Sequence, residues 1–221
     1  DAYGGYDGIY ISGAVKEVAC LAHCRRYWWE ARDTDSPRAH EALSYIGRLY
    51  ALEEQFLEAK LSGDALRGAR QKHAVSILDR FEHWLDDVEQ QRVLPKSPIG
   101  KARTYTRNQW QALRRYCEDG ALSIDNNISE RTVKIAAIGR KNYLFVGSPT
   151  GGSRAAILYS LVASCKACGV EPQAYLTDLF RTLPIASSSD TLAELLPDRW
   201  LATHPAHVWQ IDQLRQEERK R

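Results

Sequence analysis

The sequence predicts a mainly α-helical protein with a few short strands. Three long stretches repeat apolar residues at intervals of three and four, which is the spacing of one face of a helix: residues 37–61, 64–91 and 100–117. Gly63 separates the first two stretches, and prolines precede the third. We therefore expect an all-helical block over residues 36–119, with the strands outside it.

The segment before this block is expected to contain a turn, a strand and a helix. The first eight residues are rich in Gly, Tyr and Asp, a composition typical of turns. Val15–Leu21 is predicted to be a short strand, and residues 23–32 a helix. Within the block, the apolar positions expected to face the core are Leu43, Ile46, Leu49, Tyr50, Leu52, Phe56 and Leu57, then Val75, Leu78, Phe81, Trp84 and Leu85, then Tyr105, Trp110, Leu113 and Tyr116.

The part after the block mixes short strands and helices. Gly120 is expected to end the third long helix. Strands are predicted at residues 121–124 and 143–146, on either side of a helix that carries Glu130. Residues 148–152 are expected to form a flexible loop. Further helices are predicted at residues 153–168, 172–182 and 190–196, before a charged end that we expect to be disordered.

Composition limits the class of protein. Hydrophobic residues make up 44% of the chain, enough for a sizeable core, and the formal net charge is +2, so any contact with nucleic acid has to come from local patches. No apolar run is long enough to span a membrane, and no signal peptide opens the chain. Five cysteines without secretory features favour reduced thiols and a cytoplasmic location. Because methionine is absent, even at position 1, we interpret the chain as a fragment whose upstream part is missing.

The stretch from Ile124 to Lys134 is the most informative motif. It places the carboxylate of Glu130 in the first turn of a predicted helix, with Lys134 one turn later on the same face. Spacing alone favours a structural role, in which Asn127 caps the helix and Glu130 pairs with Lys134. The same residue types also suit a metal-dependent site on nucleic acid, where the acid holds a divalent cation and the lysine meets a phosphate.

A site of that kind needs clustered carboxylates, because two metal ions must be held by oxygen ligands during an in-line displacement. Asp1 is the candidate partner of Glu130. The two acids are far apart in the sequence, so they meet only if the fold returns the chain after the helical block.

Cysteine and histidine residues suggest a second kind of metal site. Cys20 and His23 are spaced as Cys-x-x-His, and Cys165 and Cys168 are spaced as Cys-x-x-Cys, so the four could ligate zinc. The alternative is that the cysteines are small buried core residues. His23 by itself could lie beside a phosphate or an active carboxylate.

A glycine-rich region with cations suggests contact with a phosphate backbone. The cations Arg140 and Lys141 lie within the stretch Gly139–Asn142. A second glycine-rich stretch, Gly147–Arg154, contains Ser153, which is expected to open a helix. Glycines allow close approach of a phosphate, and a helix N-terminus favours anions. Together with Arg154, these residues suit DNA backbone contact, although a glycine hairpin with solvated cations is an equal alternative.

Taken together, the motifs resemble the transposase of the insertion-sequence-66 family. The resemblance extends to about Trp200, and its motifs occur in order. They are Asp1–Tyr6, Cys20–Arg26, Pro95–Ala102, Asn108–Trp110, Ile124–Asn127, Ser129–Arg131, Ile138–Asn142, Gly151–Ala156 and Leu158–Leu161.

The resemblance implies a DDE-type recombinase with an RNase H-like core that binds two Mg²⁺ (or Mn²⁺) ions through two aspartates and a glutamate. Asp1 matches the second aspartate, Glu130 matches the glutamate, and the first aspartate falls upstream of this sequence. Lys134 matches a basic position, usually arginine in the family, and is expected to hold a terminal phosphate of the element end. His23, Arg140, Lys141 and Arg154 are the other candidate DNA contacts.

The resemblance also implies a division of the chain. Residues 1–35 and 120–154 would belong to a partial RNase H-like α/β core, residues 36–119 to a helical insertion, and residues 155–200 to a C-terminal helical segment, followed by a charged tail at 201–221.

The implied function is metal-dependent DNA cleavage and strand transfer in the full-length protein. Expected partners are the DNA of the element ends and of the target, further copies of the protein in a homo-oligomer, and accessory proteins, with no membrane. The location implied is the cytoplasm, in association with the nucleoid. We expect the fragment alone to be inactive because the first aspartate is missing. The alternatives are a non-catalytic DNA-binding or zinc-stabilised module and an inactive transposase remnant.

Overall fold

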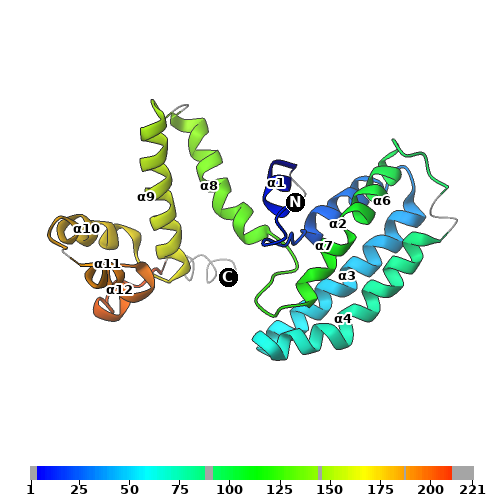
Figure 1. The fold of residues 1–221 in the computed structure, drawn as a ribbon, viewed down its shortest axis with the longest axis horizontal. Helices are drawn as coiled ribbons and strands as arrows, with labels where there is room; N and C mark the ends of the chain where they lie inside the picture. The colour runs from blue at the N-terminus through cyan, green and yellow to red at the C-terminus, as the bar shows by residue number, and fades with distance from the viewer. Residues whose placement is uncertain (1–3, 88–91, 144–145, 187, 211–221) are drawn as a thin grey trace, which may run out of the picture. The chain divides into compact units, whose positions relative to one another are not determined.

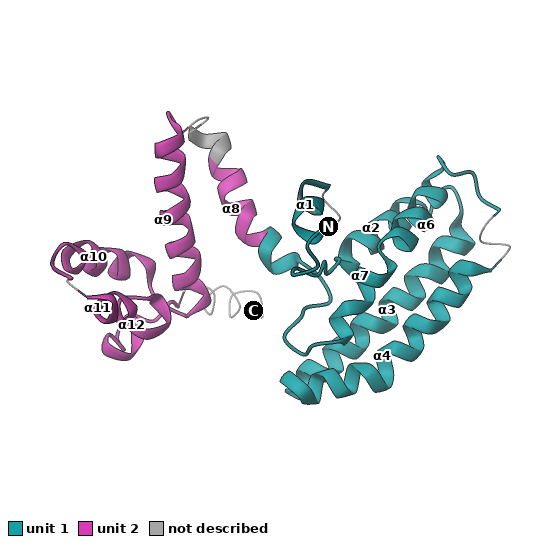
Figure 2. Cartoon of the chain, viewed as in Figure 1, with its two compact units in different colours: residues 1–130 teal, residues 131–221 magenta. Residues whose placement is uncertain are grey.

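The computed structural model describes residues 4–87, 92–143, 146–186 and 188–210, without the side chains of residue 6 and of residues 140–143. The chain divides into two compact units, Asp1–Glu130 and Arg131–Arg221 (Figure 2). The predicted mainly α fold is confirmed. Among the described residues, β-type pairing is limited to an isolated bridge between Val170 and Val208, so the RNase H-like core remains a prediction.

The first unit is a helical assembly around the long pair α3 and α4, which pack against each other (Figure 1). Helix α2 packs on α3 and α6. The elements of this unit are η1 (Gly4–Tyr6), α1 (Asp7–Tyr10), α2 (Leu21–Glu30), α3 (Ser36–Glu58), α4 (Gly63–Asp86), α6 (Pro98–Asn108), α7 (Trp110–Arg114), η2 (Arg115–Cys117) and the first turn of α8 (Asn127–Tyr143).

One hydrophobic core joins these helices. Phe81 of α4 stacks on Tyr45 of α3, with ring centroids 5.1 Å apart, and meets the edge of Trp110 of α7 at 5.4 Å. Trp28 of α2 is buried in the same core, and its indole N–H donates to the Thr106 hydroxyl of α6 at 2.9 Å. Because α2 shares this core, the predicted boundary at residue 36 does not separate two packed regions.

A buried arginine holds the turn that leads out of η2. Arg70 of α4, with a side chain only 3% exposed, makes two parallel hydrogen bonds to Glu53 of α3, at 2.9 and 2.7 Å. Its Nη1 also donates to the carbonyls of Tyr116, Asp119 and Leu122, at 2.9, 3.1 and 2.9 Å. A single guanidinium therefore satisfies carbonyls that have no helical partner.

Two glycines meet beside this turn. Gly63 has a φ of 52°, in the left-handed region. A Cβ on Gly120 would overlap the carbonyl oxygen of Gly63. The predicted role of Gly120 as the end of the third long helix is wrong, because the helical run stops at Cys117. The glycine is required instead by the close approach of the two backbones.

The predicted strands at 15–21 and 121–124 are not strands. Residues 16–20 have no regular secondary structure, and Ala19 and Leu21 donate their N–H groups to two different segments, at Ala112 and Ile124, instead of to one neighbouring strand. In the other segment, the Leu122 carbonyl is taken by Arg70. The predicted strand at 143–146 begins at the last residue of α8, and residues 144–145 lie outside the described residues.

Helix boundaries differ from the prediction in two further places. The third long stretch is divided at Gln109 into α6 and α7. The predicted flexible loop at 148–152 is wrong: α9 (Pro149–Ala167) begins there, because the Ser148 side chain accepts the Gly151 N–H at 3.0 Å and Pro149 suits the first helical position. Ser153 therefore lies inside α9 and does not open it.

The second unit packs its helices around Tyr175 and Trp200, whose rings meet edge to face at 5.6 Å. The Tyr175 hydroxyl donates to the Leu195 carbonyl at 2.9 Å. The remaining elements are α9, α10 (Pro172–Thr182), η3 (Leu183–Ile185), α11 (Ser189–Glu194) and α12 (Pro197–Thr203).

The predicted disordered tail starts too early at residue 201. Helix α12 continues to Thr203, the His207 carbonyl accepts the Glu171 N–H at 2.9 Å, and the Trp209 N–H donates to Gly169 at 2.8 Å. The charged run from Arg215 lies outside the described residues. Among the described helices, none combines the length and apolar character needed to cross a membrane.

We predict that Gly120→Ala destabilises the first unit by about 1–3 kcal/mol, because the new methyl group overlaps the Gly63 backbone. Gly68→Ala is the matched control: this α4 glycine has open space around it, so the change should stabilise by about 0.5–1 kcal/mol. Urea denaturation followed by tryptophan fluorescence measures both. Equal effects of the two substitutions would contradict the close approach of residues 63 and 120.

We also predict that Arg70→Met lowers the free energy of unfolding by about 3–5 kcal/mol, since Glu53 and three carbonyls lose their buried partner. Arg67→Met, one turn earlier, removes an ion pair to Asp64 in which both side chains are at least half exposed, and should cost less than about 1 kcal/mol. The same denaturation measurement tests this pair, and a loss below about 1 kcal/mol for Arg70→Met would count against the network.

Candidate active site

Backbone hydrogen bonds bring the first turns of α2 and α8 together. The Ala19 N–H donates to Ala112, and the Leu21 N–H donates to Ile124, both at 3.1 Å. Ile124 lies three residues before α8, so the start of α2 is fixed beside the start of α8. Residues 23 and 130, far apart in sequence, are thereby placed in neighbouring helical turns.

Asp125 organises the entry to α8. Its carboxylate accepts the Asn127 backbone N–H at 3.0 Å and the Asn127 side-chain amide at 2.7 Å. It also accepts the hydroxyl of Tyr50, from α3, at 2.9 Å. Burial, followed by this contact with the acid, raises the pKa of Tyr50, so the phenol stays a donor. The Asn127 side chain, predicted to cap the helix, instead donates to Asp125, which also accepts the first N–H of α8.

Glu130 faces His23. The His23 Nε2 and Glu130 Oε1 atoms are 3.4 Å apart, with side chains 16% and 45% exposed. Sequence spacing predicted Lys134 as the ion-pair partner of Glu130, whereas in the structure Glu130 contacts the His23 ring. Burial lowers the pKa of His23; Glu130 opposes this and Arg26 adds to it. The imidazole is therefore neutral at neutral pH.

A small pocket of about 190 Å³ opens at this contact, lined by Ala22, His23, Arg26, Asn127 and Glu130. Arg26 comes from the second turn of α2 and Glu130 from the first turn of α8, and both side chains reach solvent. The pocket thus offers one carboxylate for a cation and one guanidinium for a phosphate.

The cysteines separate into two groups. The Cys20 sulfur accepts the Asn126 N–H at 3.3 Å, and the donor atoms of Cys20, His23 and Glu130 all lie within 4.8 Å of one another. Cys24, in contrast, lies in the core, where burial raises its pKa to about 12. Cys165 is fully buried in the core of the second unit. Cys20 and His23 belong to the first unit and Cys165 and Cys168 to the second, so the four-ligand set stays a prediction.

The other predicted site residues are described in part. Asp1 lies outside the described residues, so its distance from Glu130 is not given by the structure. Lys134 is exposed on α8, and Arg154 is exposed on the first turns of α9. Arg140 and Lys141 belong to the last part of α8, and their side chains are not described.

Two residues at the site were missed by sequence reasoning. Arg26 lies within the Cys20–Arg26 motif but was not singled out, although its spacing of three from His23 places both on one helix face. Tyr50 was assigned to the core by periodicity, which carries no information about its hydroxyl.

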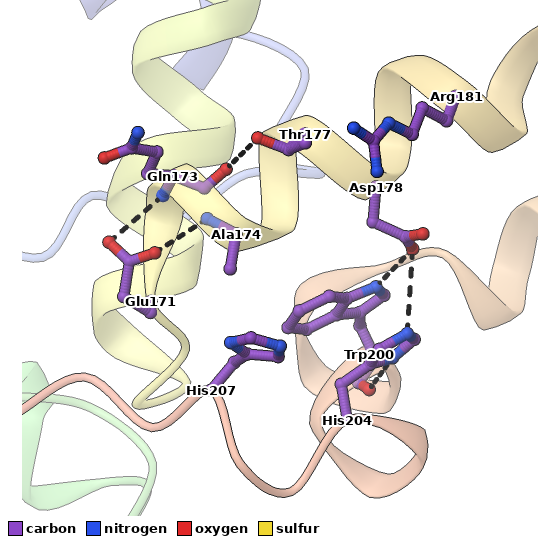
Figure 3. A pocket seen from close by; sticks show the side chains of 9 residues that line it. All are labelled: Glu171, Gln173, Ala174, Thr177, Asp178, Arg181, Trp200, His204 and His207. Carbon is purple, nitrogen blue, oxygen red and sulfur yellow. Dashed lines mark hydrogen bonds and ion pairs between the residues drawn. The ribbon is translucent and has the colours of Figure 1, made fainter.

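A larger hollow of about 470 Å³ lies in the second unit, between α10 and the segment after α12 (Figure 3). Asp178 accepts the Trp200 indole N–H at 2.8 Å, and the His204 ring stacks on Trp200 with centroids 4.0 Å apart. The His207 ring also lies near this indole, with the two ring centroids 5.8 Å apart. These contacts join α10 to α12 and α12 to the segment that follows it, and they are consistent with a structural role.

Mg²⁺ or Mn²⁺ fits Glu130 in one respect. These ions take oxygen ligands. The half-exposed Glu130 carboxylate faces the pocket, where one of its oxygens can bind a metal ion. Among the described residues, it is the carboxylate that lines this pocket.

Comparison with known proteins identifies the family. Residues 1–154 match the model described as "Transposase IS66 family", and residues 160–197 match "IS66 C-terminal element". The chain is 33% identical over 193 residues to the uncharacterized protein y4jD of Sinorhizobium fredii, covering 86% of this chain and 37% of the relative. It is 29% identical over 227 residues to the uncharacterized protein y4hP of the same strain, covering 94% and 40%.

The chain thus spans about two-fifths of the length of these relatives. No solved structure matches it. The first family model covers more than half of the chain, and the chain therefore belongs to the IS66 transposase family.

Proposed function

We propose that the chain forms part of a DDE-type DNA transposase in which Glu130 is a ligand of the catalytic metal ions. Membership of a transposase family carries this proposal. The half-exposed carboxylate of Glu130 at the pocket supports it. Asp1 is the second ligand in the proposal, on the basis of its match to the family motif.

The ions in the proposal are Mg²⁺ or Mn²⁺. When bound, they would activate a water or a 3′-hydroxyl for attack on a phosphodiester and stabilise the leaving oxygen. The protein side chains orient the ions and the DNA. Asp125, which is tied to Tyr50, fixes the first turn of α8 and so holds the Glu130 carboxylate in place.

His23 and Arg26 act on the DNA side of the proposed site. The half-buried, neutral imidazole places no positive charge beside the acid, so Glu130 stays available to a metal ion. The Arg26 side chain is 61% exposed and its contact with Glu30 is long, 4.0 Å. It is therefore free to turn toward a phosphate in the pocket.

Lys134, Arg140, Lys141 and Arg154 are proposed to contact the DNA backbone at the element ends or the target. Lys134 follows Glu130 by one helical turn, so it can meet a phosphate close to the metal site, as a point charge and not as a bidentate fork. Assembly as a homo-oligomer and use of accessory proteins belong to the same proposal for the whole protein.

An RNase H-like core is also part of the proposal. Helix α8 carries exposed apolar side chains at Ile128, Ile135 and Ile138, with 68%, 45% and 53% exposure, and their spacing of seven and three residues places them on one face of the helix. A helix that covers one face of a β-sheet would present such side chains to it.

We predict that Glu130→Gln in the full-length protein abolishes Mg²⁺-dependent cleavage of element ends and leaves DNA affinity within a few-fold. Loss of a residue that only supports a metal ligand typically costs about 10–100-fold, so loss of the ligand itself should cost more than about 100-fold. Glu54→Gln, at an exposed position on α3, is the matched control and should cleave normally. Cleavage at the unmodified rate by Glu130→Gln would remove this residue from the catalytic set.

We predict that Lys134→Ala and Arg154→Ala weaken DNA binding equally on all sequences. Each should reduce the slope of log K against log salt by about 1, because each removes one phosphate contact. Arg48→Ala, an exposed cation on α3, serves as the control with unchanged slope. Fluorescence anisotropy at several salt concentrations gives the slopes. Slopes equal to that of the unmodified protein would show that neither Lys134 nor Arg154 contacts a phosphate.

A further inference from the structure

We propose that Cys20, His23 and Glu130 form a binding site for a borderline transition-metal ion such as Zn²⁺. This site differs in donor chemistry from the oxygen-ligated ions of the proposed catalytic reaction. It also differs from the cysteine set suggested by spacing, because Glu130 takes the place of Cys165 and Cys168.

The geometry of the histidine and the acid suits a shared ion. Zinc bonds of about 2.0–2.2 Å to nitrogen and oxygen, at a tetrahedral angle, separate the two donor atoms by about 3.4 Å. His23 Nε2 and Glu130 Oε1 are 3.4 Å apart. That distance is longer than a well-formed N–H···O hydrogen bond, so the pair is spaced better for a common metal ion than for a direct bond.

The Cys20 sulfur is the third ligand of the proposed site. All donor atoms of the set lie within 4.8 Å of one another, and a zinc-bound sulfur and nitrogen are about 3.6 Å apart at the tetrahedral angle. Closing the remaining gap takes movement of roughly 1 Å, which is within reach of rotation of the half-exposed Glu130 side chain and of the His23 ring.

The donor set selects the class of ion. A thiolate, an imidazole and a carboxylate are ligands that zinc accepts together, whereas magnesium prefers oxygen ligands alone. A bound Zn²⁺ would be balanced by the two negative charges of Cys20 and Glu130. The site therefore needs no further acid to be neutral.

The surroundings also support the site. The His23 Nδ1 atom is buried and has no hydrogen-bond partner among the described residues, so those residues do not fix the tautomer of the ring, and Nε2 can carry the lone pair that a metal ion needs. The Asn126 N–H points at the Cys20 sulfur at 3.3 Å, a contact that suits a metal-bound thiolate. The pocket of about 190 Å³ leaves room for water as the fourth ligand.

One consequence rests on the proposed function. Glu130 would belong both to this site and to the catalytic set, so Zn²⁺ and Mg²⁺ would compete for one carboxylate. Zinc at micromolar concentration should then inhibit Mg²⁺-dependent cleavage in the full-length protein, and Cys20→Ser should relieve that inhibition.

The test is zinc binding by the 221-residue chain, measured by competition with a chromophoric chelator, and Co²⁺ binding followed by absorption. We expect one ion per chain and a thiolate-to-cobalt absorption band. Cys20→Ser and His23→Ala should each weaken zinc binding at least 10-fold. The matched controls, Cys168→Ser in the second unit and His83→Ala at an exposed position of α4, should bind as the unmodified chain does.

Several outcomes would overturn the site. They are the absence of stoichiometric zinc binding, unchanged affinity in Cys20→Ser and His23→Ala, or loss of binding in Cys168→Ser. Circular dichroism checks that each variant is folded. If Cys20→Ser does not fold, the cobalt–thiolate band and His23→Ala decide the question. Failure of zinc binding leaves the catalytic role of Glu130 untouched, because that role is tested by Mg²⁺-dependent cleavage in Glu130→Gln.

Discussion

The guanidinium of Arg70 is the interaction on which the first unit depends. It is buried between α3 and α4, where Glu53 neutralises its charge, and it donates to three carbonyls of the segment that leaves η2. An unpaired charge in this position would be costly, whereas a fully satisfied one fixes every group that it contacts. The helical pair thereby sets the path of a segment that has no regular structure of its own.

That path determines the site. Two residues after the last carbonyl held by Arg70, Ile124 accepts the Leu21 N–H and fixes the start of α2. Asp125 then takes the Tyr50 hydroxyl from α3 and the first N–H of α8. The positions of His23 and Glu130 are consequences of these bonds. A change at Arg70, far from the pocket in sequence, is therefore expected to act on the geometry of the pocket as well as on stability.

The helices could be predicted from the sequence, because burial of one face leaves a period that is visible residue by residue, as at Leu78, Phe81 and Leu85. Residues 15–21, predicted to form a strand, misled the same reasoning. β-type composition indicates an extended backbone, but a strand also needs a partner, and here the N–H groups go to two separate segments. Periodicity likewise assigned Leu57 to the core, although it is 77% exposed.

Residues that act through long-range contacts were the hardest to predict. Arg70 and Tyr50 each lie on a regular helix, and nothing near them in sequence indicates that their polar atoms reach residues 116–125. Glu130 was found because it begins a helix after a polar entry, yet its partner was given as Lys134. Local spacing can rank only neighbours on the same helix, whereas His23 comes from a helix more than 100 residues earlier.

The protonation state of His23 links the two metal proposals. A protonated imidazole would form an ion pair with Glu130 and compete with any cation for the carboxylate. Burial is the largest influence on the pKa of His23 and lowers it, and this outweighs the opposing effect of the acid. The neutral ring places no positive charge beside Glu130 and offers a nitrogen lone pair of its own. The same burial therefore makes the acid available to Mg²⁺ and the imidazole available to Zn²⁺, and the ion that is present decides which donor set is used.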